Sequence, residues 1–198
     1  MDDLEVVPLT PSRFTDLAAL FEEGGDPKWC WCTYFRVRGR SWANATAASN
    51  RAELESLTGR DERDHPAPGL IAYREGRTIG WVSLGPRADF DRLAYSKVLA
   101  PLDDVPVWSI VCFVVSRRER GRGVAAALLQ EAIAYAREQG ATILEAYPID
   151  TGAGRVPAAS AFHGTLAIFE RAGFHVAALR RLNESTPVRP IVRLELSS

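Results

Sequence analysis

The spacing of hydrophobic residues changes several times along this chain, and each change marks a predicted element. Residues 107–115 form a continuous apolar run rich in β-branched and aromatic side chains, which is typical of a strand buried on both faces. Residues 124–139 carry apolar side chains at helical spacing, and Gly140 supplies a helix stop. We expect the rest of the chain to be organised around this strand, turn and helix.

The same patterns predict elements on either side of this segment. Predicted strands cover residues 4–9, 70–74, 78–84, 142–147, 174–182 and 188–196. Predicted helices follow Thr10 and Pro11, which suit an N-cap and a first helical position, and cover residues 44–57 and 158–172. A short gap with Gly76 predicts an antiparallel hairpin, whereas the helix at 124–139 should join two parallel strands by a right-handed crossover.

The turn between the central strand and its helix has the composition of an anion site. Gly121 and Gly123 let the backbone approach a ligand closely, and the following helix presents free N–H groups and a positive dipole end. Arginines at 117, 118, 120 and 122 add donors suited to phosphate. The turn is too short for a triphosphate loop and lacks the three-glycine dinucleotide pattern, so another phosphate-bearing cofactor is favoured. An arginine-rich turn that is merely solvated is the alternative.

Two stretches resemble the GNAT superfamily of N-acetyltransferases. Residues 120–125, Arg-Gly-Arg-Gly-Val-Ala, resemble the family's Q/R-x-x-G-x-G/A motif, and residues 166–174 resemble the helix that ends in Gly-Phe. The resemblance covers residues 70–196. It implies a single α+β domain over residues 1–198, an α/β/α sandwich whose mostly antiparallel sheet contains one parallel, splayed strand pair. It also implies acetyl-coenzyme A as co-substrate, bound by Phe113, Val114, Val115, Arg120, Gly121, Arg122, Gly123, Val124 and Ala125.

The implied activity is transfer of an acetyl group to a primary amine of a small-molecule or protein acceptor. The family's usual catalytic Tyr position holds Phe169, which cannot donate a proton, and the usual acidic position of the central strand holds Ser109. The candidates are therefore Tyr147 as the acid, and Glu145, or Ser109 with a water, for deprotonation. A structural role for each stays open, and a non-catalytic acyl-coenzyme A sensor is the alternative function.

Residues 28–35 combine four aromatic residues with two cysteines, and predict either a wall of the acceptor pocket or a loop fixed by aromatic burial. Trp29 and Trp31 are the candidate acceptor contacts here, whereas Trp108 faces either the acceptor or the core. His163 is either a packing residue or a base. A Cys-x-Cys pair supplies two ligands where a closed zinc site needs four, so no metal is expected.

The remaining composition narrows the function classes. A net charge of −1 in 198 residues disfavours nucleic-acid binding, despite the local arginines, and no 18-residue apolar run predicts a membrane span. Three cysteines do not form a disulfide framework, so a cytoplasmic location is expected. The scarcity of lysine, present only at Lys28 and Lys97, favours a bacterial source. Monomer and homodimer are both compatible with the sequence.

Overall fold

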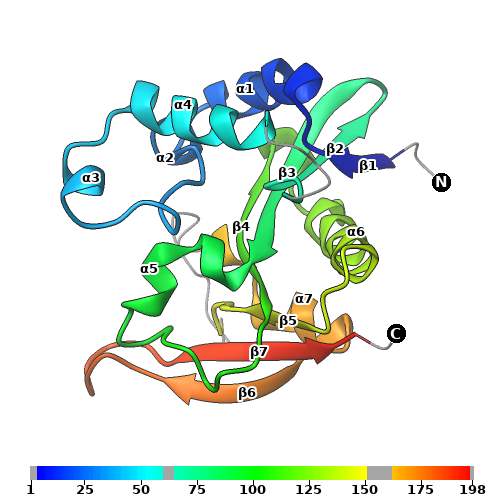
Figure 1. The fold of residues 1–198 in the computed structure, drawn as a ribbon. Coiled ribbons are helices and arrows are strands. Elements are labelled where there is room, and N and C mark those ends of the chain that lie inside the picture. Colours follow the sequence, from blue (N-terminus) through cyan, green and yellow to red (C-terminus); the bar gives the residue numbers. More distant parts are fainter. Residues whose placement is uncertain (1–3, 60–64, 151–161, 197–198) are drawn as a thin grey trace.

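A computed structural model describes residues 4–59, 65–150 and 162–196. Its centre is a seven-stranded sheet with the order β1-β2-β3-β4-β5-β7-β6 (Figure 1). Only β4 and β5 pair in parallel among these strands; the other neighbours are antiparallel. This confirms the predicted mostly antiparallel sheet with one parallel pair. The strands are β1 Leu4–Pro8, β2 Gly69–Arg74, β3 Arg77–Pro86, β4 Trp108–Val115, β5 Ile143–Ala146, β6 His175–Arg180 and β7 Arg189–Glu195.

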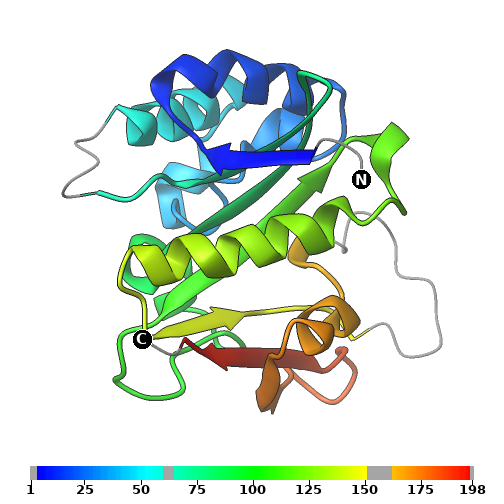
Figure 2. The same cartoon turned by 90° about the vertical axis from the view of Figure 1, so that its right-hand side faces the viewer.

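Helices cover both faces of this sheet, as predicted. They are α1 Phe14–Glu22, α2 Pro27–Cys30, α3 Gly39–Ala43, α4 Ala47–Thr58, α5 Asp91–Ala94, α6 Val124–Glu138 and α7 Leu166–Arg171, with 3₁₀ turns at Pro11–Arg13, Arg87–Asp89 and Arg117–Glu119. One core packs α1 and α4 against the sheet through residues such as Phe21 and Trp81. The other packs α6 and α7 through residues such as Phe113 and Phe169 (Figure 2).

The first turn of α6 lies close against β3. A Cβ atom added to Gly80 would lie 2.9 Å from Val124 Cγ1 and 3.0 Å from Leu128 Cδ1. Glycine at this position therefore allows the helix to approach the strand more closely than any other residue would. This contact fixes where the turn between β4 and α6 lies relative to the sheet.

The parallel strands part after three residue pairs. Trp108 to Ile110 of β4 pair with Leu144 to Ala146 of β5, and β5 ends at Ala146. β4 continues to Val115, where it is paired with β3 alone among the described strands. One edge of β4 is therefore open from Val111 onward, which is the splayed arrangement that the family resemblance implied.

Two predicted helices have different bounds in the structure. The helix expected at 44–57 corresponds to α4 and starts only at Ala47, because Thr46 is extended and forms a reciprocal capping box with Ser49. The separate helix α3 precedes it at Gly39–Ala43. The helix expected at 158–172 starts only at Leu166, because Gly164 takes a left-handed φ of +77°. Residues 158–161, and nearly all of the loop predicted at 150–157, lie outside the described residues.

Thr10 is the N-cap and Pro11 the first helical residue, as predicted, although the Thr10 side chain makes no capping bond. The first turn is a 3₁₀ helix, and Thr10 Oγ1 contacts Ser12 Oγ at 2.9 Å instead of capping a backbone N–H. The predicted hairpin is confirmed, since β2 and β3 pair antiparallel through a turn in which Glu75 and Gly76 both have positive φ.

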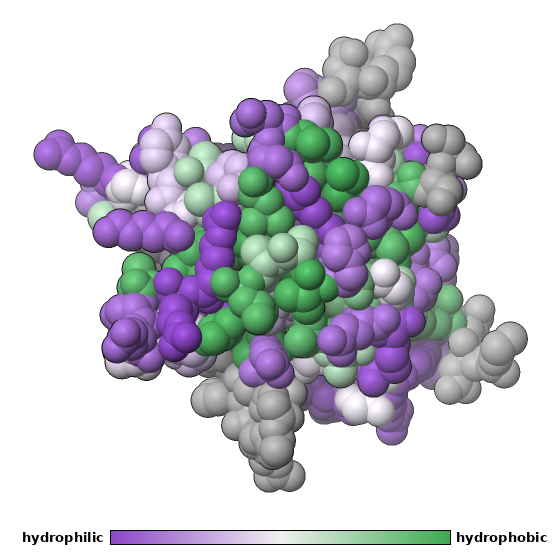
Figure 3. All heavy atoms as spheres, turned by 90° about the horizontal axis from the view of Figure 1, so that it is seen from below, coloured by the Kyte–Doolittle hydropathy of each residue, from purple (hydrophilic) through white to green (hydrophobic). Residues whose placement is uncertain are grey.

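Apolar side chains gather on the face that carries β6 and β7 (Figure 3). The exposed large apolar residues of this region are Val176, Leu179, Leu182 and Val188. None of the helices in the described part of the chain is long and apolar enough to cross a membrane.

Candidate active site

The turn that joins β4 to α6 presents an uncapped helix N-terminus. Gly121 and Gly123 have φ of +76° and +79°, and Gly123 is the N-cap of α6 without any side-chain capping bond. A Cβ atom at either glycine would meet no atom within 4 Å, so glycine is required here by backbone conformation and not by crowding. No side chain therefore caps the first N–H groups of α6, which leaves them available to an anion.

A buried carboxylate anchors this turn. Glu119 is 5% exposed and forms ion pairs with Arg74, which reaches it from β2, and with Arg122 at 3.6 Å. Arg120 and Arg122 are exposed, and Arg120 Nε donates to the carbonyl oxygen of Val115 at 3.3 Å. The turn therefore keeps a fixed shape while its glycine backbone and its arginines stay accessible.

A cavity of about 1090 Å³ lies on the sheet face that carries α1 and α2. Its walls come from α2 and the segment after it, from α5 and the loop after it, from β4 and from the start of β7. Cys112 and Val114 of β4 line it, beyond the last residue pair between β4 and β5. The open edge of β4 therefore borders the cavity. Of the predicted pantetheine contacts, Val114 lines the cavity, whereas Phe113 and Val115 pack in the α6 core.

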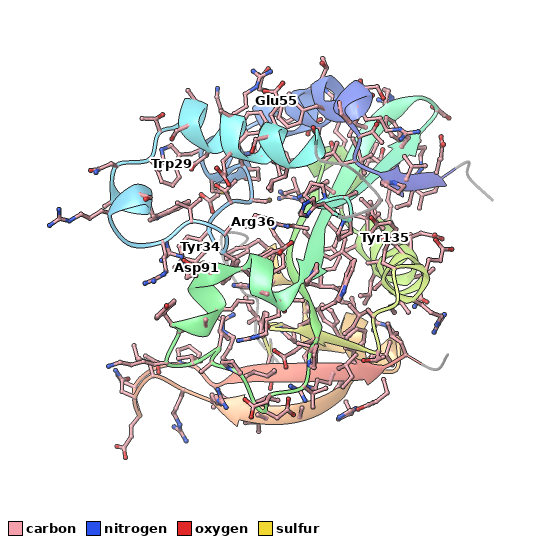
Figure 4. All side chains as sticks on the ribbon, in the orientation of Figure 1. Trp29, Tyr34, Arg36, Glu55, Asp91 and Tyr135 are labelled. Atoms are coloured by element: carbon pink, nitrogen blue, oxygen red, sulfur yellow. The ribbon has the colours of Figure 1, made fainter. Side chains whose placement is uncertain are left out.

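The three candidate acceptor tryptophans lie in different environments. Trp29 is 44% exposed and lines the cavity (Figure 4). Trp31 is 3% exposed and stacks on Phe14 in the core, and Trp108 packs against Tyr135 of α6 on the opposite face. Only Trp29 of the three lines the cavity in the described structure, so Trp31 anchors the loop, while Trp29 borders the cavity and its contact with an acceptor stays a prediction.

The three catalytic candidates are brought together where the parallel strands end. Tyr147 OH donates to Glu145 Oε1 at 2.8 Å and contacts Ser109 Oγ at 2.9 Å. All three side chains are fully buried, and none is among the residues that line the cavity. Burial, and then the charge of Glu145, raises the pKa of Tyr147 well above its ordinary value. Their catalytic roles therefore stay predictions.

Two arginines that the sequence analysis missed complete this cluster. Arg87 Nη1 pairs with Glu145 Oε1 at 2.6 Å and also bonds Tyr147 OH, while Arg193 Nε pairs with Glu145 Oε2 at 2.9 Å. Arg193 also pairs with Asp103 at 2.5 Å and lowers the pKa of that carboxyl. The alternation of Arg189, Ile191 and Arg193 along a predicted strand is the sequence signal that could have indicated inward-facing arginines.

Two polar groups on the cavity wall lack partners. His163 is 8% exposed and its ring lies 4.0 Å from that of Phe162; its Nδ1 has no hydrogen-bond partner within the described structure. Burial, and then the charge of Arg189, lower the pKa of His163 to about 3, although a hydrogen bond with the Val111 backbone acts in the opposite direction. Arg189 Nη1 is likewise buried without a partner in the described residues, and burial lowers the pKa of this arginine.

The fold gathers the three cysteines at the same wall. Cys32 Sγ lies 3.1 Å from Cys112 Sγ, although 80 residues separate them, and Cys30 is hydrogen-bonded to Cys32. That hydrogen bond and burial raise the pKa of Cys30, and burial raises that of Cys32, so neither is activated as a thiolate. Among the described residues, no group of three or more His, Cys, Asp or Glu side chains is arranged to hold a metal ion.

Comparison with known proteins agrees with this fold. The acetyltransferase (GNAT) family matches residues 28–166, and the chain belongs to this family of acetyltransferases. No curated protein matches the chain significantly.

Several solved structures share the fold at low sequence identity. A Drosophila melanogaster polyamine N-acetyltransferase, which forms N-acetylagmatine, aligns with a TM-score of 0.59 and 15% identity over 98% of this chain and 100% of its own. The PaiA N-acetyltransferase of Thermoplasma acidophilum, in complex with coenzyme A, aligns with a TM-score of 0.55 and 14% identity over 98% of this chain and 99% of its own. A GNAT acetyltransferase from Streptococcus pneumoniae aligns with a TM-score of 0.55 and 14% identity over 98% of this chain and 100% of its own.

Proposed function

We propose that this protein transfers the acetyl group of acetyl-coenzyme A to a primary amine held in the cavity. The observation that carries the proposal is the position of the uncapped α6 N-terminus at the end of the same strand whose open edge borders the cavity. A helix N-terminus binds the diphosphate of such a substrate, and an open strand edge offers hydrogen bonds to an extended amide-containing arm.

The residues of the turn fit acetyl-coenzyme A. Gly121 and Gly123 have positive φ and no atom within 4 Å of an added Cβ, and the exposed Arg120 and Arg122 supply positive charge beside them. The backbone of residues 113–115 would hold the pantetheine arm, and residues 120–125 the diphosphate. The complex of PaiA with coenzyme A supports the same assignment of the cofactor.

The chemistry joins the amine nitrogen to the thioester carbon, breaks the carbon–sulfur bond and returns one proton to the leaving thiolate. Holding the two substrates in a fixed relative position supplies a large part of such a rate enhancement. The cavity wall presents a neutral imidazole at His163, because its lowered pKa leaves it uncharged at neutral pH. We keep Tyr147, with Glu145 and Ser109, as the proposed acid and bases. Their hydrogen-bonded cluster lies where β4 and β5 begin to part.

The acceptor is a small molecule or a protein amine. The Drosophila relative acts on a polyamine, which supports a small acceptor, and a cavity of about 1090 Å³ accommodates one. The alternative, an acyl-coenzyme A sensor, is favoured by the burial of all three catalytic candidates away from the cavity.

Release of free thiol distinguishes the two functions. Purified protein is mixed with acetyl-coenzyme A and a panel of primary amines, and thiol is followed by a colorimetric reagent. The enzyme releases thiol at a rate that depends on the amine. A sensor shows a rise in melting temperature with acetyl-coenzyme A and no amine-dependent release, and that result would refute the proposed activity.

A further inference from the structure

The cavity holds more cationic than anionic side chains. Arg38, Arg92 and Arg189 line it, against a single carboxylate, Asp26, among the described lining residues. Arg38 Nε is paired with Asp91 at 2.8 Å. Arg92 donates to the carbonyl oxygens of Tyr34 at 2.6 Å and Val37 at 2.8 Å. Two of the three arginines are therefore engaged in holding the cavity wall together.

Arg189 is the third arginine of the cavity wall. Within the described structure its Nη1 has no hydrogen-bond partner, although the atom is buried. Arg193 lies four residues further along β7 and on the same face. It shows the usual outcome for such a position, because it is paired with both Glu145 and Asp103. A buried guanidinium donor without an acceptor is unfavourable unless a ligand supplies one.

A second unpaired group points to the same place. His163 Nδ1 is buried without a partner, lines the same cavity, and lies close enough to Arg189 to be affected by its charge. Burial keeps this imidazole neutral, so its Nδ1 can form one hydrogen bond with a ligand without adding charge to the cavity. The cavity thus contains one cationic and one neutral polar group that both require a partner.

We propose that Arg189 binds a carboxylate of the acceptor, so that the amine substrate is an amino acid or a similar amino carboxylate. The guanidinium presents a planar set of donors that matches the two oxygens of a carboxylate. The aromatic walls formed by Trp29, Tyr34, Tyr95 and Phe162 suit an apolar or aromatic body between the carboxylate and solvent. His163 Nδ1 forms a hydrogen bond with a polar group of the same molecule. This assignment rests on the proposed function for its amine, but the carboxylate site is independent of catalysis.

Binding of a minimal probe tests the carboxylate site without requiring turnover. Phenylacetate and phenylacetamide have the same shape and differ in charge, and their affinities are measured by calorimetry or ligand-detected NMR. We expect the protein to bind phenylacetate at least about tenfold more tightly than phenylacetamide, since charge-assisted bonds are the stronger ones. Arg189→Gln should abolish this preference. Arg181→Gln is the matched control, because Arg181 is exposed and outside the cavity lining, and it should retain the preference.

Turnover then tests the assignment to the acceptor. The kcat/KM for phenylalanine should exceed that for phenethylamine by at least about tenfold, and Arg189→Gln should reduce this ratio to about one. Arg189→Lys keeps the charge and should retain part of the preference, which guards against a loss caused by misfolding.

Three results would overturn the inference: equal binding of the two probes, an unchanged preference in Arg189→Gln, or equal loss in Arg181→Gln. A fall in acetyl-coenzyme A affinity in Arg189→Gln, with carboxylate preference intact, would also refute it, because Arg189 would then belong to the coenzyme site. If no amine releases thiol while phenylacetate still binds through Arg189, the proposed acetyl transfer fails and the carboxylate site stands.

Discussion

Two groups of buried polar side chains lie on the same face of the sheet and differ in one respect. In the paired cluster, defined as Arg87, Ser109, Glu145, Tyr147 and Arg193, no buried nitrogen or oxygen of a side chain lacks a partner. In the unpaired pair, His163 and Arg189, each residue keeps one buried nitrogen without a partner in the described structure. Buried polar groups are nearly always hydrogen-bonded in folded proteins. The hydrogen bonds of the paired cluster are therefore satisfied within the protein, whereas those of the unpaired pair require a ligand.

The largest effect that we expect concerns the centre of the paired cluster. Glu145→Gln keeps the size of the side chain but removes the charge that two buried arginines share. Breaking a buried ion pair on one side costs about 3 kcal/mol, so we expect the free energy of unfolding to fall by about that amount. Chemical denaturation measures it, and a loss below about 1 kcal/mol would contradict the structural role.

The unpaired pair should show itself in the pH dependence of stability. The pKa of His163 is lowered from 6.5 to about 3 in the folded state, so this group contributes stability above pH 6.5 that is lost as pH falls from 6.5 toward 3. The slope is about 1.4 kcal/mol per pH unit. Between pH 7 and pH 5 the free energy of unfolding of the wild type should therefore fall by about 2 kcal/mol more than that of His163→Gln. Chemical denaturation at each pH measures this difference. Parallel curves for the two proteins would show that His163 titrates normally.

The smallest expected effect separates structure from catalysis within the paired cluster. Tyr147→Phe removes one hydroxyl; Arg87 and Glu145 keep other bonds, whereas Ser109 loses its bond to Tyr147, so stability should fall by about 1 kcal/mol. Because Tyr147 is the proposed acid, we expect kcat to fall by about tenfold or more. An unchanged kcat would remove Tyr147 as the acid and leave it a structural role, in keeping with its absence from the cavity lining.

The part of the molecule that the sequence predicted best is one continuous segment of the chain. Strand β4, the glycine turn and α6 follow one another directly, so hydrophobic periodicity and two glycines sufficed to predict these three elements. The family resemblance added the mostly antiparallel sheet and the parting of its one parallel strand pair. Local patterns carry this information because each residue's neighbours in sequence are also its neighbours in space.

The cavity could not be predicted in the same way, because its walls come from segments that lie far apart in the sequence. The contact of Cys32 with Cys112 spans 80 residues, and nothing near either cysteine indicates it. His163 was placed in a helix, whereas the positive φ of Gly164 puts it ahead of α7, on the cavity wall. Arg189 and Arg193 differ only in the partners that other segments bring to them. Long-range packing decides such roles, and a periodic pattern does not contain it.

The central claim is that the backbone at the start of α6 binds the diphosphate of acetyl-coenzyme A, and a pair of glycines at the two ends of this helix tests it. Gly123 and Gly140 have φ of +79° and +80°, and a Cβ at either would meet no atom within 4 Å. Replacing each by alanine imposes the same backbone strain, about 1 kcal/mol, but only Gly123 lies at the N-terminus.

Calorimetric titration with acetyl-coenzyme A should therefore give at least about tenfold weaker binding for Gly123→Ala and unchanged binding for Gly140→Ala, since the added methyl group stands only at the anion site. Equal affinity of both variants and the wild type would contradict the account.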